Sequence, residues 1–353
     1  MRKRTLNHIR GCLAGGAVGD ALGAPVEFMS LKEIRDQFGP DGISEYAPAY
    51  GRKGAITDDT QMTLFTAEGL ILSRVRADKK ISTSLVEFVY QAYLRWLSTQ
   101  EQTEKDHMIQ QYGVCTMVDG ILITRPELFS IRAPGNSCLS ALKSGHMGTV
   151  ETPANSSKGC GGVMRIAPVG YFLPPDQVFD AACAIAAITH GHPTGYLTAG
   201  CLAQIISGVS HGATLPEAIR YAVQMLKTKS GHEETLAAIQ AALRALKTAP
   251  VSPETVETLG AGWIAEEALA IGLYSALASG GDFGKGLRLA VNHSGDSDST
   301  GAITGNLLGA VLGLEAIPEK YLTGLELLDT IEELAEDLFN RMADGGKQPG
   351  AEQ

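Results

Sequence analysis

Two segments near opposite ends of the chain carry a glycine at every fourth position, and this spacing restricts the fold more than any other feature. The glycines are Gly11, Gly15, Gly19 and Gly23 in the first segment and Gly301, Gly305, Gly309 and Gly313 in the second. Positions four apart form a ridge on one face of an α-helix. A glycine inside a helix costs about 1 kcal/mol relative to alanine, so flexible loops are the alternative. We expect two deeply buried helices whose backbones approach closely, in the simplest arrangement against each other.

Helical patterns account for most of the remaining chain. Apolar residues recur at three- and four-residue spacing in many Ala- and Leu-rich segments, which is typical of amphipathic helices. Alternating strand patterns are scarce, and the apolar segment 163–172 is interrupted by Pro168 and Gly170. The sequence therefore predicts an all-α fold. The expected helices are 5–23, 59–77, 82–98, 136–144, 176–189, 194–210, 215–228, 233–247, 263–278, 283–292, 299–314 and one near 324–342.

The composition is that of a globular chain with a large core. Hydrophobic residues make up 44% of the 353 positions and charged residues 19%. Length alone would permit two domains, but no segment has the composition of a linker. We therefore expect one domain over residues 1–342. Residues 343–353 lack a core pattern and are expected to form a disordered tail.

Charge and hydropathy exclude several classes of protein. The formal net charge of −10 argues against a nucleic-acid-binding surface. No run of 18 apolar residues is present, which argues against a membrane span. The basic segment 1–10 leads into a glycine-rich stretch containing Asp20 rather than the apolar core of a signal peptide. Six cysteines without a C-x-x-C pair are expected to be reduced. We therefore expect a cytoplasmic protein.

Two acidic clusters, far apart in the sequence, carry the clearest indication of chemistry. They are ITDDT at 56–60 and GDSDST at 295–300, and each combines two carboxylates with hydroxyl groups at the start of an expected helix. Oxygen ligands without His or Cys suit Mg²⁺, Ca²⁺ or Mn²⁺ better than zinc. Brought together, the clusters would hold two metal ions about 3.5–4 Å apart, a spacing used to activate water. The alternative for each cluster alone is a helix N-cap with acids that stabilise the helix dipole.

Glu27 is a single acid in an apolar, glycine-rich stretch, between Val26 and Phe28. A buried carboxylate needs a partner, and a metal ion or a polarised water would supply one. The alternative is a salt bridge to an arginine such as Arg165. Close packing of the two glycine rows would bring Glu27 and Asp20 near the second acidic cluster.

Two glycine-containing loops offer backbone donors for a ligand. The segment GCGGVMR at 159–165 has no Gly-Lys-Ser/Thr and is not a Walker A loop, but its exposed N–H groups could bind phosphate. The segment GNSC at 135–138 is either an oxygen-binding turn or a helix cap. His190 and His192 have a spacing that is weak for metal binding, and we expect structural roles for them.

These motifs together resemble those of the ADP-ribosylglycohydrolases. The resemblance rests on GCLAGGAVGDALG at 11–23, Glu27, ITDDT at 56–60, GGVMRIAP at 161–168, Thr189 with His190, and GDSDS at 295–299. Segment 20–33 is especially similar to the dinitrogenase reductase-activating branch, which acts on ADP-ribosylated arginine. The family's usual GDTDT reads GDSDS here, and serine keeps the hydroxyl ligand.

The resemblance implies a compact orthogonal helix bundle with a central cleft that holds two Mg²⁺ ions, or Mn²⁺ in their place. The implied metal ligands are Thr57, Asp58, Asp59, Asp296, Asp298 and Ser299. The implied substrate-binding residues are Asn136, Ser137, Gly159, Gly161, Gly162, Met164 and His190. Glu27 is implied as a catalytic or metal-gating carboxylate. We expect it to be the general base, with Asp59 as the alternative, and the general acid is unassigned.

The expected function is removal of ADP-ribose from modified proteins by a dimetal-dependent hydrolase. The bond implied is the N-glycosidic bond to arginine, so that the enzyme reverses mono-ADP-ribosylation in metabolic regulation or in immunity to a toxin. The implied partners are an ADP-ribosylated protein and a cognate ADP-ribosyltransferase. One alternative is another linkage of ADP-ribose, to serine, in O-acetyl-ADP-ribose or in poly-ADP-ribose. Another is a non-catalytic binder of a transferase or of a modified protein, which would not need the intact acidic clusters.

Overall fold

The computed structural model describes residues 5–80, 84–101 and 120–342. Within these ranges the chain forms 16 α-helices, a few 3₁₀ turns and one hairpin of two-residue strands, β1 (Pro48–Ala49) and β2 (Arg52–Lys53). The prediction of an all-α fold is therefore confirmed. The tail expected at 343–353 and one of the six cysteines, Cys115, lie outside the described residues.

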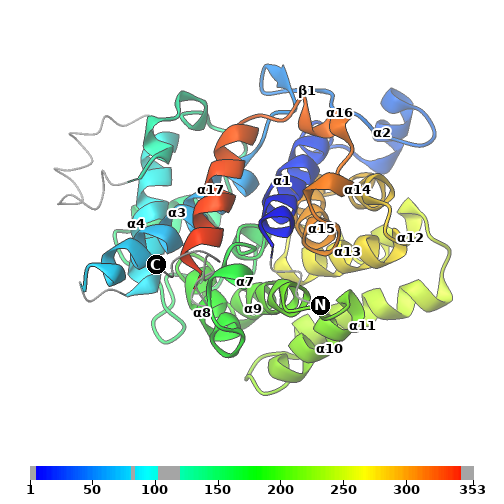
Figure 1. The fold of residues 1–353 in the computed structure, drawn as a ribbon. Coiled ribbons are helices and arrows are strands. Elements are labelled where there is room, and N and C mark those ends of the chain that lie inside the picture. The colour runs from blue at the N-terminus through cyan, green and yellow to red at the C-terminus, as the bar shows by residue number, and fades with distance from the viewer. Residues whose placement is uncertain (1–4, 81–83, 102–119, 343–353) are drawn as a thin grey trace, which may run out of the picture.

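The helices follow one another in the order shown in Figure 1. The first half contains α1 (Leu6–Gly23), α2 (Leu31–Phe38), α3 (Asp58–Asp78), α4 (Leu85–Gln100), α6 (Asn136–Lys143), α7 (Val169–Phe172) and α8 (Pro175–Ala187). The second half contains α9 (Pro193–Ser210), α10 (Leu215–Leu226), α11 (Glu233–Thr248), α12 (Pro253–Glu257), α13 (Ala265–Ala278), α14 (Phe283–Val291), α15 (Ser297–Leu312), α16 (Glu319–Leu322) and α17 (Leu328–Arg341).

The centre of the bundle is the antiparallel pair of α1 and α15, one from each end of the chain (Figure 1). The two glycine rows face each other along the whole contact. The facing pairs are Gly11 with Gly309, Gly15 with Gly305, Gly19 with Gly301, and Gly23 with Ser297. The prediction that the two rows pack against each other is therefore confirmed.

The glycines are required because backbone meets backbone in this contact. A Cβ atom added to Gly15 would lie 2.5 Å from the carbonyl oxygen of Gly305, and one added to Gly11 would lie 2.7 Å from that of Gly309. A real Cβ does not approach a carbonyl oxygen so closely. Gly313 differs from the expectation: α15 ends at Leu312, and Gly313 is the C-cap with φ 84°. A glycine favours this left-handed conformation, which stops the helix.

The other helices cover the central pair from two sides. Helices α13 and α14 pack on α15, and α17 and α3 pack beside α1. Helix α4 covers α3, while α8, α9 and α10 form a further layer that meets α13 through α9. Figure 1 shows these helices crossing one another around the pair, as in an orthogonal bundle. Among the described residues, no helix is both long enough and apolar enough to cross a membrane.

The structure contains four short helices that the sequence patterns did not indicate: α2, α7, α12 and α16. Helix α2 had a recognisable signal, because Ser30 and Glu33 form a capping box around its first turn. The helix expected from residue 324 begins only at Leu328, after Leu327 in a left-handed conformation with φ 58°. The turn at Leu327 thus redirects the chain before α17.

Substituting Gly305 by alanine is expected to lower the free energy of unfolding by about 2 kcal/mol or more, because its Cβ would overlap the backbone of Gly15. Gly284→Ala in α14 is the matched control. Its Cβ would come closest to the end of the flexible Arg288 side chain, at 3.2 Å, and would make an ordinary contact with Asp282 Oδ1 at 3.6 Å, so the gain in helix propensity makes it neutral or stabilising. Urea denaturation of both variants tests this. Equal stability of the two variants would contradict the close backbone contact.

Candidate active site

A cavity of about 210 Å³ lies where the ends of α3, α6 and α15 meet the loop at 159–164 and the turn after α1. Its lining consists of Glu27, Asp58, Asp59, Ala133, Gly135, Asn136, Ser137, Cys138, Gly159, Cys160, Gly161, Met164, His190, Trp263, Asp296, Asp298 and Ser299. A larger cavity of about 620 Å³ between α4, α8 and α9 has a mixed lining in which only Glu151, Asp180 and Lys229 are charged. Chemistry, not size, therefore identifies the smaller cavity as the candidate site.

The cavity brings together the site residues predicted from the sequence, with two exceptions. Thr57 is fully buried behind the lining, where its side chain hydrogen-bonds Asp298. Gly162 is also buried and backs the loop, because a Cβ there would lie 3.3 Å from Ala186 and 3.4 Å from the carbonyl oxygen of Gly195. All the other predicted catalytic, metal and substrate residues border one cavity.

Both acidic clusters lie at helix N-termini, where the backbone has unpaired N–H groups. Thr57 is the N-cap of α3 and accepts a hydrogen bond from the Asp59 N–H, at 3.3 Å. Asp296 is the N-cap of α15 and accepts one from the Ser299 N–H, at 3.2 Å. Helix capping therefore accounts for the hydroxyl group of Thr57 and for one carboxylate oxygen of Asp296. It gives no role to the side chains of Asp58 and Asp59.

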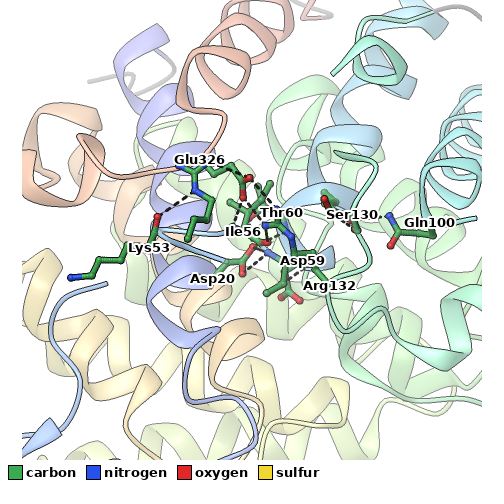
Figure 2. Close-up of polar contacts among 12 residues, drawn as sticks. Asp20, Lys53, Ile56, Asp59, Thr60, Gln100, Ser130, Arg132 and Glu326 are labelled. Carbon is green, nitrogen blue, oxygen red and sulfur yellow. Dashed lines mark hydrogen bonds and ion pairs between the residues drawn. The ribbon is translucent and has the colours of Figure 1, made fainter. Parts of the chain in front are cut away.

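Asp20 joins the first cluster to the central helix pair. It is fully buried on α1, and its carboxylate accepts hydrogen bonds from the Thr57 N–H at 3.0 Å, the Thr60 N–H at 3.1 Å and the Thr60 hydroxyl (Figure 2). Burial, with a further contribution from the charge of Asp298, raises the pKa of Asp20 to about 7. Asp20 thus holds the start of α3 in place.

The carboxylates of the two clusters repel one another. Burial first, and then the charge of Asp298, raise the pKa values of Asp58, Asp59 and Asp296 well above the usual range. Such a cluster is unfavourable by itself and is stabilised either by protons or by cations.

Glu27 is 6% exposed, borders the cavity and is surrounded by the same negative charges. Burial, followed by Asp298, Asp296 and Asp58, raises its pKa to about 10. Its Oε2 atom is buried without a hydrogen-bond partner. The salt bridge considered above is not formed, since Arg165 instead donates to the Thr189 hydroxyl at 2.7 Å and lies over a tyrosine ring.

The donors at this site fit divalent cations of the Mg²⁺ type. Glu27 Oε2 and Asp59 Oδ1 are buried oxygens without a partner, and the two acidic clusters that border the cavity offer carboxylate and hydroxyl oxygens. In the described part of the chain, no three Asp, Glu, His or Cys side chains form a ready-made ligand group. Hydroxyl groups, water or substrate oxygens must therefore complete any coordination.

The opposite side of the cavity is formed by glycine backbone and a buried histidine. A Cβ on Gly161 would lie 2.9 Å from both His190 Cε1 and Cys138 Sγ, so this loop can only pass with a glycine there. Burial lowers the pKa of His190 to about 3, which makes it neutral, and its Nδ1 lies 2.8 Å from the Thr189 hydroxyl. The Gly135 N–H donates to Asp58 Oδ2 at 3.1 Å and so links the two sides.

A buried ion pair, absent from the sequence predictions, supports the first cluster (Figure 2). Glu326 accepts hydrogen bonds from Arg132 Nη1 at 2.6 Å, Arg132 Nη2 at 3.1 Å and the Ile56 N–H at 3.1 Å. Arg132 Nη1 also donates to the Ile56 carbonyl oxygen at 2.7 Å. Both polar groups of Ile56, which precedes Thr57, are thereby held. No local motif marks Glu326 or Arg132, because they are single residues far apart in the sequence.

The cavity also includes Trp263 and Ala133, which the sequence did not single out, and Cys160, which lies in the predicted glycine loop but was given no role. Cys160 Sγ donates to Asp296 Oδ2 at 2.9 Å, and Trp263 is 42% exposed. Gly262 and Trp263 lie in the loop between α12 and α13, and a glycine followed by a tryptophan in a loop is a recognisable local signal. No sequence motif, however, connects this loop with the acidic clusters.

Comparison with known proteins agrees with this arrangement. A family model described as ADP-ribosylglycohydrolase matches residues 1–348. The chain belongs to the ADP-ribosylglycohydrolase family. Membership places it among the hydrolases that remove ADP-ribose.

Three relatives of the ADP-ribosylglycohydrolase family cover nearly all of the chain. The ADP-ribosyl-[dinitrogen reductase] glycohydrolase of Rhodospirillum rubrum is 27% identical over 90% of each protein. The ADP-ribosylarginine hydrolase Tri1 of Serratia proteamaculans is 25% identical over 95% of this chain and 80% of its own length. A solved structure entitled "ADP-ribosylglycohydrolase-related protein complex" superposes with a TM-score of 0.69 at 26% identity, over 96% of this chain and 99% of its own.

Glu326→Gln is expected to lower the free energy of unfolding by about 3 kcal/mol, because it leaves the buried Arg132 cation without its charged partner. The rate of ADP-ribose release is expected to fall as well, since Ile56 loses its support. Glu333→Gln removes the exposed ion pair with Arg125 and is the matched control, with an effect below about 1 kcal/mol. Urea denaturation and an activity assay measure both effects. Similar losses in the two variants would refute a special role of the buried pair.

Asp298→Asn is expected to stabilise the protein in EDTA, because it removes a negative charge that raises the pKa of Asp20. The same substitution is expected to lower the rate of hydrolysis. The raised pKa of Asp20 means that the folded protein keeps a proton which the unfolded chain releases near pH 3.8. The wild-type free energy of unfolding therefore loses this contribution as the pH rises towards 7. The variant should be little different at pH 5 and more stable by at least about 1.4 kcal/mol at pH 7.5, the equivalent of one pKa unit. Exposed Asp36→Asn is the control in the same urea titrations, and destabilisation at both pH values would contradict carboxylate repulsion.

Proposed function

We propose that this ADP-ribosylglycohydrolase cleaves the N-glycosidic bond between ADP-ribose and arginine, with two divalent cations, Mg²⁺ or Mn²⁺, at the two acidic clusters. The observation that carries this proposal is the pair of unpartnered oxygens, Glu27 Oε2 and Asp59 Oδ1, inside a cavity crowded with buried carboxylates. Similarity to the arginine hydrolase Tri1 and to the dinitrogen reductase glycohydrolase supports the choice of linkage.

The cations would be held by the carboxylate and hydroxyl groups at the starts of α3 and α15. The proposed ligands are Thr57, Asp58, Asp59, Asp296, Asp298 and Ser299. Bound there, the cations would bind ribose hydroxyl groups and lower the pKa of water. Thr57 is buried behind the lining, so its hydroxyl would act from the protein side of the site.

The other side of the cavity would bind the nucleotide. In the loop at 159–164, the N–H groups of Gly159, Cys160, Val163 and Met164 donate to protein atoms, so those of Gly161 and Gly162 are the ones that would bind a diphosphate. Asn136 and Ser137 at the start of α6 would contact the distal part of ADP-ribose, and neutral His190 offers a hydrogen bond without adding charge. Gly159, Gly161 and Met164 would line the ribose and diphosphate pocket, with Gly162 supporting their loop from behind.

The reaction adds water across the bond from the anomeric carbon to the guanidine nitrogen. The water oxygen bonds to the anomeric carbon as that carbon–nitrogen bond breaks, and the electron pair leaves with the guanidine. Cations bound at the two clusters would offset the negative charges that raise the pKa of Glu27, so the carboxyl would be ionised and would accept the proton released by the water; its Oε2 has no other partner. Asp59 is the alternative base. The guanidine gains a proton to leave as neutral guanidine or guanidinium, and the donor of that proton is unassigned.

The biological setting follows from the same proposal. The substrate would be a cytoplasmic protein modified on arginine by a cognate ADP-ribosyltransferase. The enzyme would then reverse that modification, either as metabolic regulation or as protection against a toxin. The whole domain, residues 1–342, would act as one unit.

Release of ADP-ribose from an arginine-modified protein tests the proposal, in Mg²⁺, in Mn²⁺ and in EDTA. We expect release with either metal and none in EDTA. Asp298→Ala should lower the rate by about a hundred-fold or more, because even residues that only orient metal ligands matter by 10- to 100-fold. Asp36→Ala, an exposed acid on α2, is the matched control.

Peptides of one sequence, modified on either arginine or serine, identify the linkage. Cleavage of the serine-linked peptide alone would replace arginine by another linkage within the same family. Metal-independent release would overturn the dimetal assignment. Binding of ADP-ribose without hydrolysis of any linkage would favour a non-catalytic binder.

A further inference from the structure

Two aromatic rings stack on each other at the edge of the cavity and remain open to solvent. The ring centroids of Phe28 and Trp263 are 5.8 Å apart, and their planes differ by 19°. Phe28 is 73% exposed, the largest fraction of any large hydrophobic side chain in the described ranges, and Trp263 is 42% exposed and lines the cavity. Aromatic side chains this exposed at a concave site are typical of ligand contacts.

Each of the two aromatic residues belongs to a short segment that adjoins an acid of the site. Phe28 directly follows Glu27 in a turn closed by two backbone hydrogen bonds, from Val26 N–H to the Gly23 carbonyl at 2.8 Å and from Met29 N–H to the Val26 carbonyl at 3.0 Å. This turn continues from the glycine row of α1, so the position of Phe28 depends on the central helix pair.

The backbone of Trp263 is held by the loop at 159–164. Its carbonyl oxygen accepts a hydrogen bond from the Cys160 N–H at 3.2 Å. The preceding residue, Gly262, packs against Asp296, since a Cβ there would lie 3.3 Å from Asp296 Cβ. Glu267 accepts the Gly262 N–H at 3.2 Å and fixes the loop. The aromatic pair therefore lies where the acidic clusters meet the loop at 159–164, with Trp263 held between Cys160 and the Asp296 segment, and Phe28 next to Glu27 in the chain.

The surroundings of the pair favour a cation. The charges that act on the adjacent Glu27 are those of Asp298, Asp296, Asp58 and Asp20. An aromatic face attracts a guanidinium group through its quadrupole, by about 0.5–2 kcal/mol depending on exposure. With divalent cations on the acidic clusters, a planar cation that enters here would be attracted mainly by the faces of the two exposed rings. A neutral side chain would gain only the contact with the rings.

We propose that Phe28 and Trp263 receive the side chain of the modified arginine and so select a cationic leaving group. This inference rests on the proposed arginine-specific hydrolysis and names the surface that recognises the arginine. A nucleobase also stacks on aromatic rings. However, the rings adjoin the carboxylates at which the anomeric carbon must lie, so the group that meets them is the one bonded to that carbon.

A binding experiment tests the proposal without any need for turnover. The chain has two tryptophans, and the other, Trp96, is fully buried, so changes in emission report on Trp263. The wild-type protein, saturated with ADP-ribose and Mg²⁺, is titrated with an arginine peptide and with the same peptide containing citrulline, a neutral isostere. We expect the arginine peptide to change the emission and to bind about fivefold or more tightly than the citrulline peptide. Equal binding of the two peptides would overturn the proposal.

Kinetics separates recognition of the side chain from chemistry. Phe28→Leu and Trp263→Leu keep apolar bulk but remove the aromatic faces, and each should raise KM for an arginine-linked peptide about fivefold or more. The value of kcat should change by less than about twofold, and the Kd for ADP-ribose should not change. Trp263→Phe should restore most of the loss, and Tyr221→Leu, an exposed aromatic on α10, is the matched control.

The outcomes distinguish this inference from the proposed function. If the wild type releases no ADP-ribose from arginine but still prefers the arginine peptide in the titration, the function fails and the cation surface stands. If the wild type hydrolyses the arginine linkage and both leucine variants keep the wild-type KM, the inference is wrong but the proposed function stands. If the variants lose ADP-ribose affinity as much as peptide affinity, the rings serve the nucleotide and the inference is wrong.

Discussion

The close contact of α1 with α15 is the constraint on which the rest of the structure depends. Glycine rows let the two backbones approach along the whole interface, from Gly11 with Gly309 to Gly23 with Ser297. One end of this interface is also the start of α15, so the same contact that organises the bundle brings Asp20 and Glu27 to the second acidic cluster. The cost of placing so many glycines in helices is offset by this packing. Stability and the assembly of the site therefore share one interface.

The site is the least favourable part of that interface when no cation is bound. Buried carboxylates raise one another's pKa values, and Glu27 and Asp59 each keep an oxygen without a partner. Helix N-termini, Asp20 and the pair of Arg132 with Glu326 hold the geometry despite this repulsion. The fold holds these carboxylates close together before any cation binds. Their mutual repulsion therefore lowers the stability of the protein when cations are absent.

Much of the site could be predicted from local sequence because its parts are short and chemically distinctive. The acidic clusters, the glycine loop at 159–164 and Asn136 each appear as a motif, and the structure places them around one cavity. The contribution of Glu326 could not be predicted, because an isolated glutamate near the C-terminus looks like a surface residue until Ile56 and Arg132 are beside it. The stacking of Phe28 on Trp263 is equally invisible in sequence, since it joins two distant loops.

The sequence by itself determined the helical class, the two glycine rows and the oxygen-rich character of the clusters, because periodicity, the missing side chain of glycine and ligand chemistry are local properties. Only the tertiary structure decided that the glycine rows meet antiparallel, that Glu27 is left without an arginine, and that Thr57 lies behind the lining while Trp263 lies in it. These outcomes depend on which distant backbones come into contact. That depends on the packing of the whole core, which no local pattern contains.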